Sequence, residues 1–566
     1  MKKSLLVLLV AATLVGPLWA NPSTNSSTNQ PANPSANTPA NPNPDEDKIC
    51  THKVISAPDN TLLAWYKPQV PGAAYSYVAK LAAKFLKDVL PVDEATGLRY
   101  YYMYASFEGF QNSANDTFRG ETHRSNPACV AAGLTESLAV KHYMYDGDAA
   151  YLQLVRENLD FMLSNATTPA DFHWASCPYA SSDPGSTIIQ GTNYYGNGNG
   201  DAYLCLEPDK VGEMGVAYLQ FYQITEEQKY LDAALSCADA LAANVREGNY
   251  KESPWPYRVH ARTNLAMEEY CSYVIPPVRL FDMLANLNSR LKLGDERMAA
   301  YGRARDMAWE WLFSLEGPMK TYVWKGYFED VPYDHDNKNR VQIAPMETAR
   351  YLMENADAVP FLKENIPALI HYCNSTFGTD NALGYNAQCE QSICMLPMGS
   401  HTARYASVCA MWYNLCGEDW YKKESFENFN WATYCTSETG YVAVGPTYNP
   451  SWFSDGYGDY IKHFFDGMAA VPEWAPSDEN HLLKSSSVVQ SISYEPTQIS
   501  YKTFLPNAKE ILRLTKMPKQ ILVDGKPLKR VDDTKESEGW NWEKLSDGGV
   551  VRLNRLGGRD VLILLK

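Results

Sequence analysis

Apolar positions recur with a helical period along most of the chain, from Tyr75 to about Val471. The pattern predicts twelve helices, at 75–90, 126–145, 148–164, 208–224, 227–246, 266–291, 295–315, 343–356, 358–376, 398–416, 419–433 and 455–470. Links after the even-numbered helices are short, and links after the odd-numbered helices are long. Short links join antiparallel neighbours, so an up-and-down ring of these helices would gather every long link at one end.

The two sets of helices also differ in composition. The even-numbered helices carry small residues, as in Ala131-Ala132-Gly133 and Gly215-Val216-Ala217, which allow the close approach that an inner ring requires. The odd-numbered helices alternate charged and apolar positions, which is typical of an outer ring with one face in water. An irregular solenoid is the alternative, but no repeat of fixed period is visible.

From about Ser485 the pattern changes to the alternation of β-strands. Candidate strands lie at 491–494, 499–501, 511–514, 521–523, 550–553 and 561–564. Asp524-Gly525 and Asp547-Gly548-Gly549 are hairpin signals between them. These features predict a small antiparallel β-sandwich at the C-terminus.

With its six predicted hairpins, its alternating links and its C-terminal strands, the chain resembles the six-hairpin glycosidase-like superfamily. These are the (α/α)₆ toroids of glycoside hydrolases and polysaccharide lyases, and the resemblance covers roughly residues 75–471. It implies a mainly α fold and a sugar cleft at the N-termini of the inner helices. We recognise no family-specific catalytic motif, so no catalytic residue carries over.

The N-terminus has the features of a secretory signal. Met1-Lys2-Lys3 is basic, Leu5 to Val15 is apolar, and Ala20 offers a small residue for cleavage. The apolar run is too short for a membrane span, so none is expected after cleavage. The sequence therefore predicts a signal peptide at 1–20, a disordered Asn/Pro/Ser/Thr-rich linker at 21–48, a toroid at 49–480 and a β-sandwich at 481–566. The mature protein is expected to be secreted or periplasmic.

Charge and cysteine content narrow the choice of partners. The formal net charge of −16 argues against a nucleic-acid partner, because binding phosphates needs a basic surface. Twelve cysteines in an exported chain make disulfides plausible, and Cys177 and Cys205, which share one long link, are the first candidates. No cysteine or histidine spacing suggests zinc, and no metal is assigned. We expect a carbohydrate partner and a monomeric protein.

Aromatic and basic residues concentrate on the long links. Aromatic rings suit the CH-rich face of a pyranose, and arginine forks suit the carboxylate of a uronic acid. The candidate substrate-binding residues are Arg119, Arg124, Trp174, Tyr194, Tyr195, Arg262, Trp324, Tyr327, Arg340 and Tyr457. Arg404 lies at the same end of the predicted ring. The alternatives are that the aromatic rings only pack the long links against the rest of the protein and that the arginines form salt bridges with nearby acids.

The densest acidic run on a long link follows Trp324 and contains Glu329 and Asp330. Glycoside hydrolysis needs two carboxyl groups, one of them protonated. Apolar neighbours raise a carboxyl pKa, which makes Asp330 a candidate acid and Glu329 its rival. Further catalytic candidates are Glu121 and His123 before the second helix and Asp455, which with Asp459 flanks Tyr457, at the start of the last helix. The links before the second and the last helix, which carry these candidates, are neighbours only if the ring closes.

Three functions follow in order of preference. A glycoside hydrolase is the first, on a poly- or oligosaccharide that could contain uronate. A polysaccharide lyase is the alternative; it would use Tyr and His for β-elimination, with His123, His173, His335 and His401 available. A non-catalytic glycan-binding protein is the third.

No cofactor is expected, with one candidate site for calcium. Asn197, Asn199 and Asp201 place oxygen atoms at alternating positions, as the start of a calcium loop does. The segment departs from the EF-hand pattern, since no Glu falls at the twelfth position. A plain Gly/Asn turn is therefore the preferred interpretation.

Overall fold

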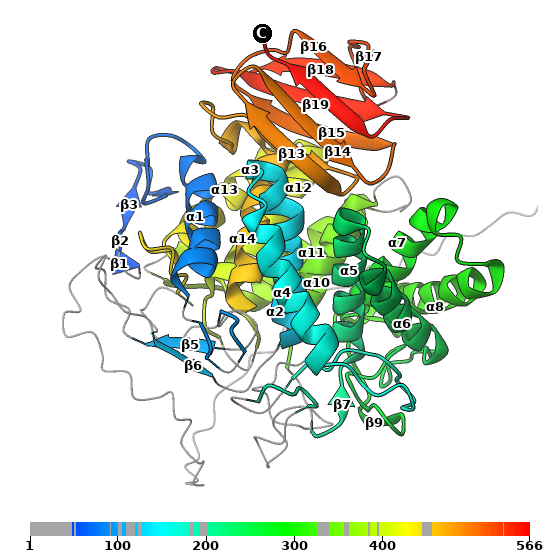
Figure 1. Cartoon of the computed structure of the whole chain (residues 1–566). Helices are drawn as coiled ribbons and strands as arrows, with labels where there is room; N and C mark the ends of the chain where they lie inside the picture. The colour runs from blue at the N-terminus through cyan, green and yellow to red at the C-terminus, as the bar shows by residue number, and fades with distance from the viewer. Residues whose placement is uncertain are drawn as a thin grey trace, which may run out of the picture. The chain divides into compact units, whose positions relative to one another are not determined.

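The computed structural model describes residues 48–49, 52–90, 92–94, 96–99, 105–108, 119–122, 127–181, 186–191, 202–326, 339–355, 362–382, 385–392, 395–443, 455–535 and 537–566. Glu46–Lys566 forms one compact unit. Its helices and strands are drawn in Figure 1.

A helical segment occupies each of the twelve predicted positions in the described chain. The first is α1 (Ala73–Lys84) with the π-helical η1 (Phe85–Val89), and the second joins α2 (Pro127–Leu134), η2 (Thr135–His142) and α3 (Tyr143–Asp146). The others are α4 (Ala150–Asn165), α5 (Pro208–Thr225), α6 (Gln228–Ala243), α7 (Ile275–Leu291), α8 (Asp295–Phe313), α10 (Ile343–Glu354), α11 (Leu362–Phe377), α12 (Gly399–Cys416), α13 (Asp419–Thr433) and α14 (Asp455–Ala470).

The predicted sixth helix starts later than the sequence pattern suggested. It was expected from residue 266, but β9 (Leu265–Glu268) pairs there with β8 (Arg258–His260), which also pairs with β7 (Cys205–Leu206). The helix begins only at Ile275, where Pro276 and Pro277 occupy its first turn. Short elements also occur on other links: β1 (Lys48–Ile49), β2 (His52–Lys53), β3 (Ile55–Ser56), β4 (Leu62–Leu63), β5 (Ala105–Glu108), β6 (Arg119–Thr122), α9 (Pro318–Thr321), β10 (Gly378–Ala382) and β11 (Tyr385–Gln388).

Six helices of the described chain form a closed inner ring. The helix that starts with α2 contacts α5, and the contacts continue through α7, α10, α12 and α14 back to α2. Each has an outer partner: α4 packs on α2, α6 on α5, α8 on α7, α11 on α10, α13 on α12 and α1 on α14. This double ring confirms the predicted (α/α)₆ toroid.

Small residues permit the close approach of neighbouring inner helices. Where the ring closes between α2 and α14, a Cβ added to Gly458 would lie 2.7 Å from the backbone carbon of Gly133. Between α5 and α7, a Cβ added to Gly215 would lie 2.5 Å from the side chain of Leu280. The ring therefore depends on glycine at these crossings.

The long links enter the inner helices at their N-termini, and the short links leave from their C-termini. Among the described residues, short links lie at Gly147, Glu226, Lys292 and Gly417, each with a positive φ that ends a helix. This alternation was predicted from the sequence, and it gathers the long links at one end of the ring.

The C-terminal strands form two packed antiparallel sheets. One has the order β12 (His481–Ser485), β15 (Ala508–Leu514), β19 (Gly549–Arg555) and β18 (Gly539–Lys544). The other has the order β13 (Val489–Glu495), β14 (Gln498–Thr503), β20 (Asp560–Leu564), β16 (Gln520–Val523) and β17 (Lys526–Pro527). All six predicted strands are present, and Asp524-Gly525 makes the expected tight turn between β16 and β17. The sequence pattern missed β12, β17 and β18.

The two sheets contact the short-link end of the ring. Tyr143 and Met144 of α3 belong to the same apolar core as the sheets. Arg290, at the end of α7, donates to the carbonyl of Phe504 at 2.7 Å and covers its ring. The sandwich therefore closes one end of the ring axis, and the long links surround the other.

The predicted Cys177–Cys205 bridge is wrong. Cys177 is a free thiol that donates to the carbonyl of Ala175, and burial raises its pKa well above the usual value. Separately, none of the described helices combines the length and apolar character that crossing a bilayer requires.

We predict that Gly458→Ala destabilises the fold by about 1–3 kcal/mol, because the added methyl group would overlap the backbone of Gly133. Gly133→Ala is the matched control. Its Cβ would meet the nearest atom of Gly458 at 3.4 Å, so a change near zero or a small gain is expected. Urea unfolding measures both, and equal losses would contradict the proposed contact.

Candidate active site

A cavity of about 110 Å³ lies on the ring axis at the long-link end. Every inner helix contributes to its wall from its N-terminal half, with Glu136, Glu213, Arg279, Glu347, Arg404 and Asp459 coming from successive helices around the ring. The position is the one that the sequence predicted for a sugar cleft. Eight of the 21 residues in the wall are charged, and the others are apolar, small or neutral polar, so ion pairs govern one part of its chemistry.

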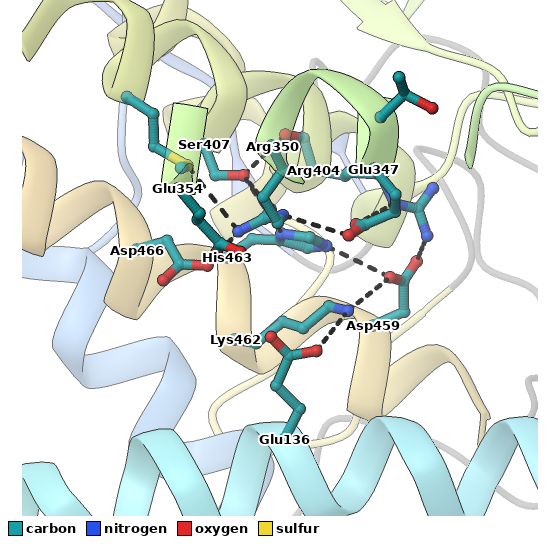
Figure 2. A network of polar contacts seen from close by, with 12 residues as sticks. Glu136, Glu347, Arg350, Glu354, Arg404, Ser407, Asp459, Lys462, His463 and Asp466 are labelled. Carbon is teal, nitrogen blue, oxygen red and sulfur yellow. Dashed lines mark hydrogen bonds and ion pairs between the residues drawn. The ribbon is translucent and has the colours of Figure 1, made fainter. Parts of the chain in front are cut away.

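A continuous set of ion pairs runs along one side of this cavity (Figure 2). Lys462 lies 3.2 Å from Glu136 and 3.9 Å from Asp459, and Asp459 also pairs with Arg404. Arg404 Nε lies 3.4 Å from Glu347. These five residues come from η2, α10, α12 and α14, so the set crosses the point where the two ends of the ring meet.

The second part of the set lies deeper in the ring. Arg350 Nε lies 3.3 Å from Glu347, and its Nη1 donates to Asp466. Asp466 also accepts from Lys141 at 2.6 Å. Arg350 is fully buried, and such a charge is tolerated only where carboxylates meet it.

The surrounding cations keep three of the cavity carboxylates, Glu136, Glu347 and Asp459, ionised. Burial alone would raise the pKa of Glu136, but the charges of Lys462, Arg279 and their neighbours outweigh it and lower the pKa to about 2. The same competition lowers the pKa of Glu347, and it holds the pKa of Asp459 well below its usual value. None of these three carboxyl groups is protonated near neutral pH.

His463 lies at the centre of the network as a neutral imidazole. Arg350 Nη2 is 2.6 Å from its Nδ1, and because a guanidinium only donates, Nδ1 is the acceptor. Its proton therefore resides on Nε2, which donates to Asp459 at 3.2 Å. Burial lowers the pKa of His463 to about 4, since a second proton would face Arg350.

His401 is a second neutral imidazole, in the first turn of α12. Burial, assisted by the charge of Arg404, lowers its pKa to about 3. Nδ1 lies 3.1 Å from the hydroxyl of Ser400, and Nε2 has no hydrogen-bond partner among the described residues. His401 lines the cavity, and in the tautomer whose Nδ1 donates to Ser400 its Nε2 is an acceptor for a ligand there.

Glu347, Asp459 and His463 could gather around a metal ion, because their ligand atoms all lie within 4.8 Å of one another. Both carboxylates are already paired with Arg404, and Nδ1 of His463 accepts from Arg350. A metal ion would have to compete with these guanidinium groups and with Lys462. We therefore assign the cluster to ion pairing.

Comparison with known proteins adds evidence on the fold. No protein-family model matches the sequence, and no curated protein matches it. Among solved structures, a cellobiose 2-epimerase from Spirochaeta thermophila is similar with a TM-score of 0.50 at 11% identity, over 70% of this chain and 97% of that one. A sugar epimerase from a ruminal bacterium has a TM-score of 0.49 at 11% identity, over 69% and 98%. A family 76 glycoside hydrolase (mannosidase) from Bacteroides thetaiotaomicron has a TM-score of 0.44 at 9% identity, over 71% and 98%.

The chain has the six-hairpin toroid fold. At these identities the likeness shows the fold alone, so the site has to be argued from this toroid's own residues.

Many of the sequence-predicted site residues fall outside the described part of the toroid. These are Glu329, Asp330, His123, Arg124, Tyr194, Tyr195 and Tyr327, together with Asn197, Asn199 and Asp201 of the calcium candidate. Arg119 and Glu121 lie in β6 and Asp455 begins α14, but only their backbones are described. Their roles stay predictions.

Three predicted substrate-binding rings are buried in the core. Trp174 is fully enclosed and donates to Asn264 at 2.7 Å, and Trp324 is equally enclosed. Tyr457 stacks on Phe85, and its hydroxyl accepts from the backbone of Val442. The expectation of exposed ring faces is wrong for these three: Trp174 and Trp324 pack their long links against the helices, and Tyr457 points from α14 into the core.

The two described arginine candidates lie away from the cavity wall. Arg262 is exposed beside the ring of Phe172, and Arg340 lies on the link before α10, where its backbone N–H donates to Ser392. The sequence pattern placed His401, Arg404 and Asp459 at the end of the ring where the cavity lies. It missed Glu136, Glu347 and Lys462, whose only signal was charge on helices that are otherwise rich in small residues.

We predict that stability falls as the pH falls from 6.5 towards 4. In this range the unfolded chain binds a proton at His463 that the folded toroid does not, so protonation favours unfolding. The slope for one such group approaches about 1.4 kcal/mol per pH unit.

His463→Gln should reduce this slope by about one proton, because the amide can still accept from Arg350 and donate to Asp459. The measurement is urea unfolding at several pH values above 4.5. His371→Gln, at an exposed position of α11, is the control and should keep the wild-type slope. An unchanged slope in His463→Gln would contradict the assigned protonation state.

Proposed function

We propose that the protein is an enzyme that acts on a carbohydrate by proton transfer, with His401 as the base in the axial cavity. The observation that carries the proposal is the buried, neutral imidazole whose Nε2 has no partner among the described residues. With the proton on Nδ1, Nε2 can accept a proton from a sugar carbon next to a carbonyl or carboxyl group; because the resting pKa is low, the negative charge that develops on the substrate has to raise the basicity of the imidazole during the transfer.

The ionised state of the wall disfavours hydrolysis by the cavity carboxylates. Oxygen atoms of Glu347 and Asp459 lie within 4.8 Å of each other, close to the spacing of a retaining glycosidase, which is about 5–5.5 Å. Such an enzyme needs one protonated member. Since the cations lower the pKa of both groups, neither can supply the acid proton.

Other groups in the cavity fit the remaining tasks of proton transfer. Tyr273 lines the same wall, and burial raises its pKa well above the usual value, so it stays a neutral donor. Arg279 pairs with Glu354 through Nη2 at 2.9 Å and lines the cavity as a fixed cation. A donor and a cation opposite a base are what an enolate-like intermediate requires.

The carbohydrate assignment rests on the chemistry of the wall and on the fold. Fixed donors and acceptors around the axis suit a ligand with many hydroxyl groups. The cavity is smaller than pockets that enclose a drug-sized ligand, which hold about 300–1,000 Å³. It would therefore take the end of a sugar chain or a single residue. The cellobiose 2-epimerase from Spirochaeta thermophila, which has the same fold, acts on a sugar.

Hydrolysis is the second candidate, because both ends of the segment with Glu329 and Asp330 are held beside the cavity. On the N-terminal side of this segment, the carbonyl of Lys325 accepts from Ser272 at 2.6 Å. On its C-terminal side, Gln342 accepts from Arg404 at 2.8 Å. A protonated Asp330 or Glu329 would supply the acid proton that Glu347 and Asp459 cannot.

Export stays part of the proposal on sequence grounds. The basic and apolar pattern of residues 1–20 supports a secreted or periplasmic enzyme. A non-catalytic glycan-binding protein is the remaining option, and the experiment below separates it from the enzymes.

We predict that incubation in D₂O with a panel of reducing sugars and uronate polysaccharides yields product labelled with deuterium on carbon. Label without chain cleavage indicates isomerisation or epimerisation, and a new conjugated double bond indicates a lyase. New reducing ends without either signal would support hydrolysis and contradict proton transfer by His401. A protein that binds a glycan but yields no product would be the non-catalytic binder.

We predict that His401→Ala lowers turnover by about 10²–10⁴-fold, the usual contribution of a general base. The melting temperature should change little, because one ring nitrogen makes no hydrogen bond in the described structure. His173→Ala is the control, since His173 is exposed and bonds to Asn244 outside the cavity. Equal activity of the two variants would remove His401 from the mechanism.

A further inference from the structure

A second, partly open cavity lies at the short-link end, where the ring meets the sandwich. Its volume is about 340 Å³, and it is lined by four inner helices (the one that starts with α2, then α5, α7 and α10) and by the sandwich segment from Lys484 to Val489 with Leu505. We call it the back cavity and the active-site candidate the front cavity. Its volume lies within the range of small-molecule sites, about 300–1,000 Å³.

The ionisable groups of the back cavity balance in charge. The cations are Lys141, Arg279 and Lys484, and the carboxylates are Glu136, Asp282 and Glu354. Most are already paired: Arg279 with Glu354 at 2.9 Å, Asp282 with Arg305 at 3.1 Å and Lys141 with Asp466 at 2.6 Å. Lys484 is exposed at the mouth and has no ion pair among the described residues, so it is the inner part of the wall, where the charges are paired, that favours a neutral ligand.

Amides and hydroxyls complete the wall. Gln220 and Asn286, the latter at the exposed mouth, make no side-chain hydrogen bond with the described residues, and each amide can donate and accept. Ser485 and Ser486 line the cavity from the sandwich, where the Ser485 hydroxyl donates to the carbonyl of Ser487 and the Ser486 hydroxyl accepts from the backbone of Lys509. Groups that both donate and accept are what a hydroxyl-rich molecule needs, since each hydroxyl does the same.

The two cavities share part of their walls. Glu136, Gln220 and Arg279 line both, so a single layer of side chains separates them. Glu136 also pairs with Lys462 of the front cavity at 3.2 Å. A ligand that binds Arg279 or Glu136 in the back cavity therefore changes the hydrogen-bond donors and the charge available in the front cavity.

We propose that the back cavity is a second binding site for a neutral, hydroxyl-rich small molecule of monosaccharide size, coupled to the front cavity through Glu136, Gln220 and Arg279. The sandwich supplies one wall of this site, which gives the C-terminal module a binding role. The choice of a sugar as ligand rests on the proposed function; the site itself rests on the cavity and its wall.

The test uses D-glucose as the probe and the full chain. Crystals soaked in D-glucose should show the sugar in the back cavity within hydrogen-bond distance of Asn286 or Gln220. In calorimetric titration, Asn286→Trp should weaken this binding about tenfold or more, because the indole fills the space that the amide lines. Ala285→Trp is the matched control, since position 285 is exposed on α7 but does not line the cavity.

Each result decides between the two proposals. Sugar in the front cavity alone, with only water in the back cavity, overturns the second site and leaves the proposed function intact. Sugar in the back cavity alone supports the second site and removes D-glucose as a front-cavity ligand. Equal effects of Asn286→Trp and Ala285→Trp, or no bound sugar at all, overturn the inference.

Discussion

Pairing of buried charges is the constraint on which the rest of this toroid depends. Glu136 meets Lys462, and Arg350 meets Asp466, across more than a hundred residues of sequence. An unpaired charge at these positions would cost several kcal/mol, so the helices that carry them are held in one order around the axis. The close crossing of Gly133 and Gly458 brings the first and last inner helices near enough for this pairing.

The same ion pairs set the chemistry that the axis can support. Cations beside Glu136, Glu347 and Asp459 keep them ionised, whereas burial and the neighbouring guanidinium groups keep His401 and His463 neutral. This is the reverse of a glycosidase pair, in which an apolar setting holds one carboxyl protonated. On the proposed function, ionised acids and a neutral imidazole in one cavity would serve proton transfer rather than hydrolysis of a glycosidic bond.

The C-terminal sandwich is more than an appendage to the ring. It shares a core with Tyr143 and Met144, and Arg290 covers Phe504 at the same boundary. Because it packs on the short-link end, a second cavity forms at this boundary, and it shares the side chains of Glu136, Gln220 and Arg279 with the first. The charges that these side chains carry make them a place where occupation of one cavity can affect the other.

The sequence by itself determined the hairpins, the alternation of links, the sandwich and the end of the ring at which the long links gather, because periodicity and turn residues act over short distances. It also brought His401, Arg404 and Asp459 into consideration. Only the tertiary structure decided that Trp174, Trp324 and Tyr457 pack inside and that Cys177 stays a thiol. It alone paired Glu136 with Lys462, since a charge on a helix surface looks alike in sequence whether it faces water or a partner across a ring.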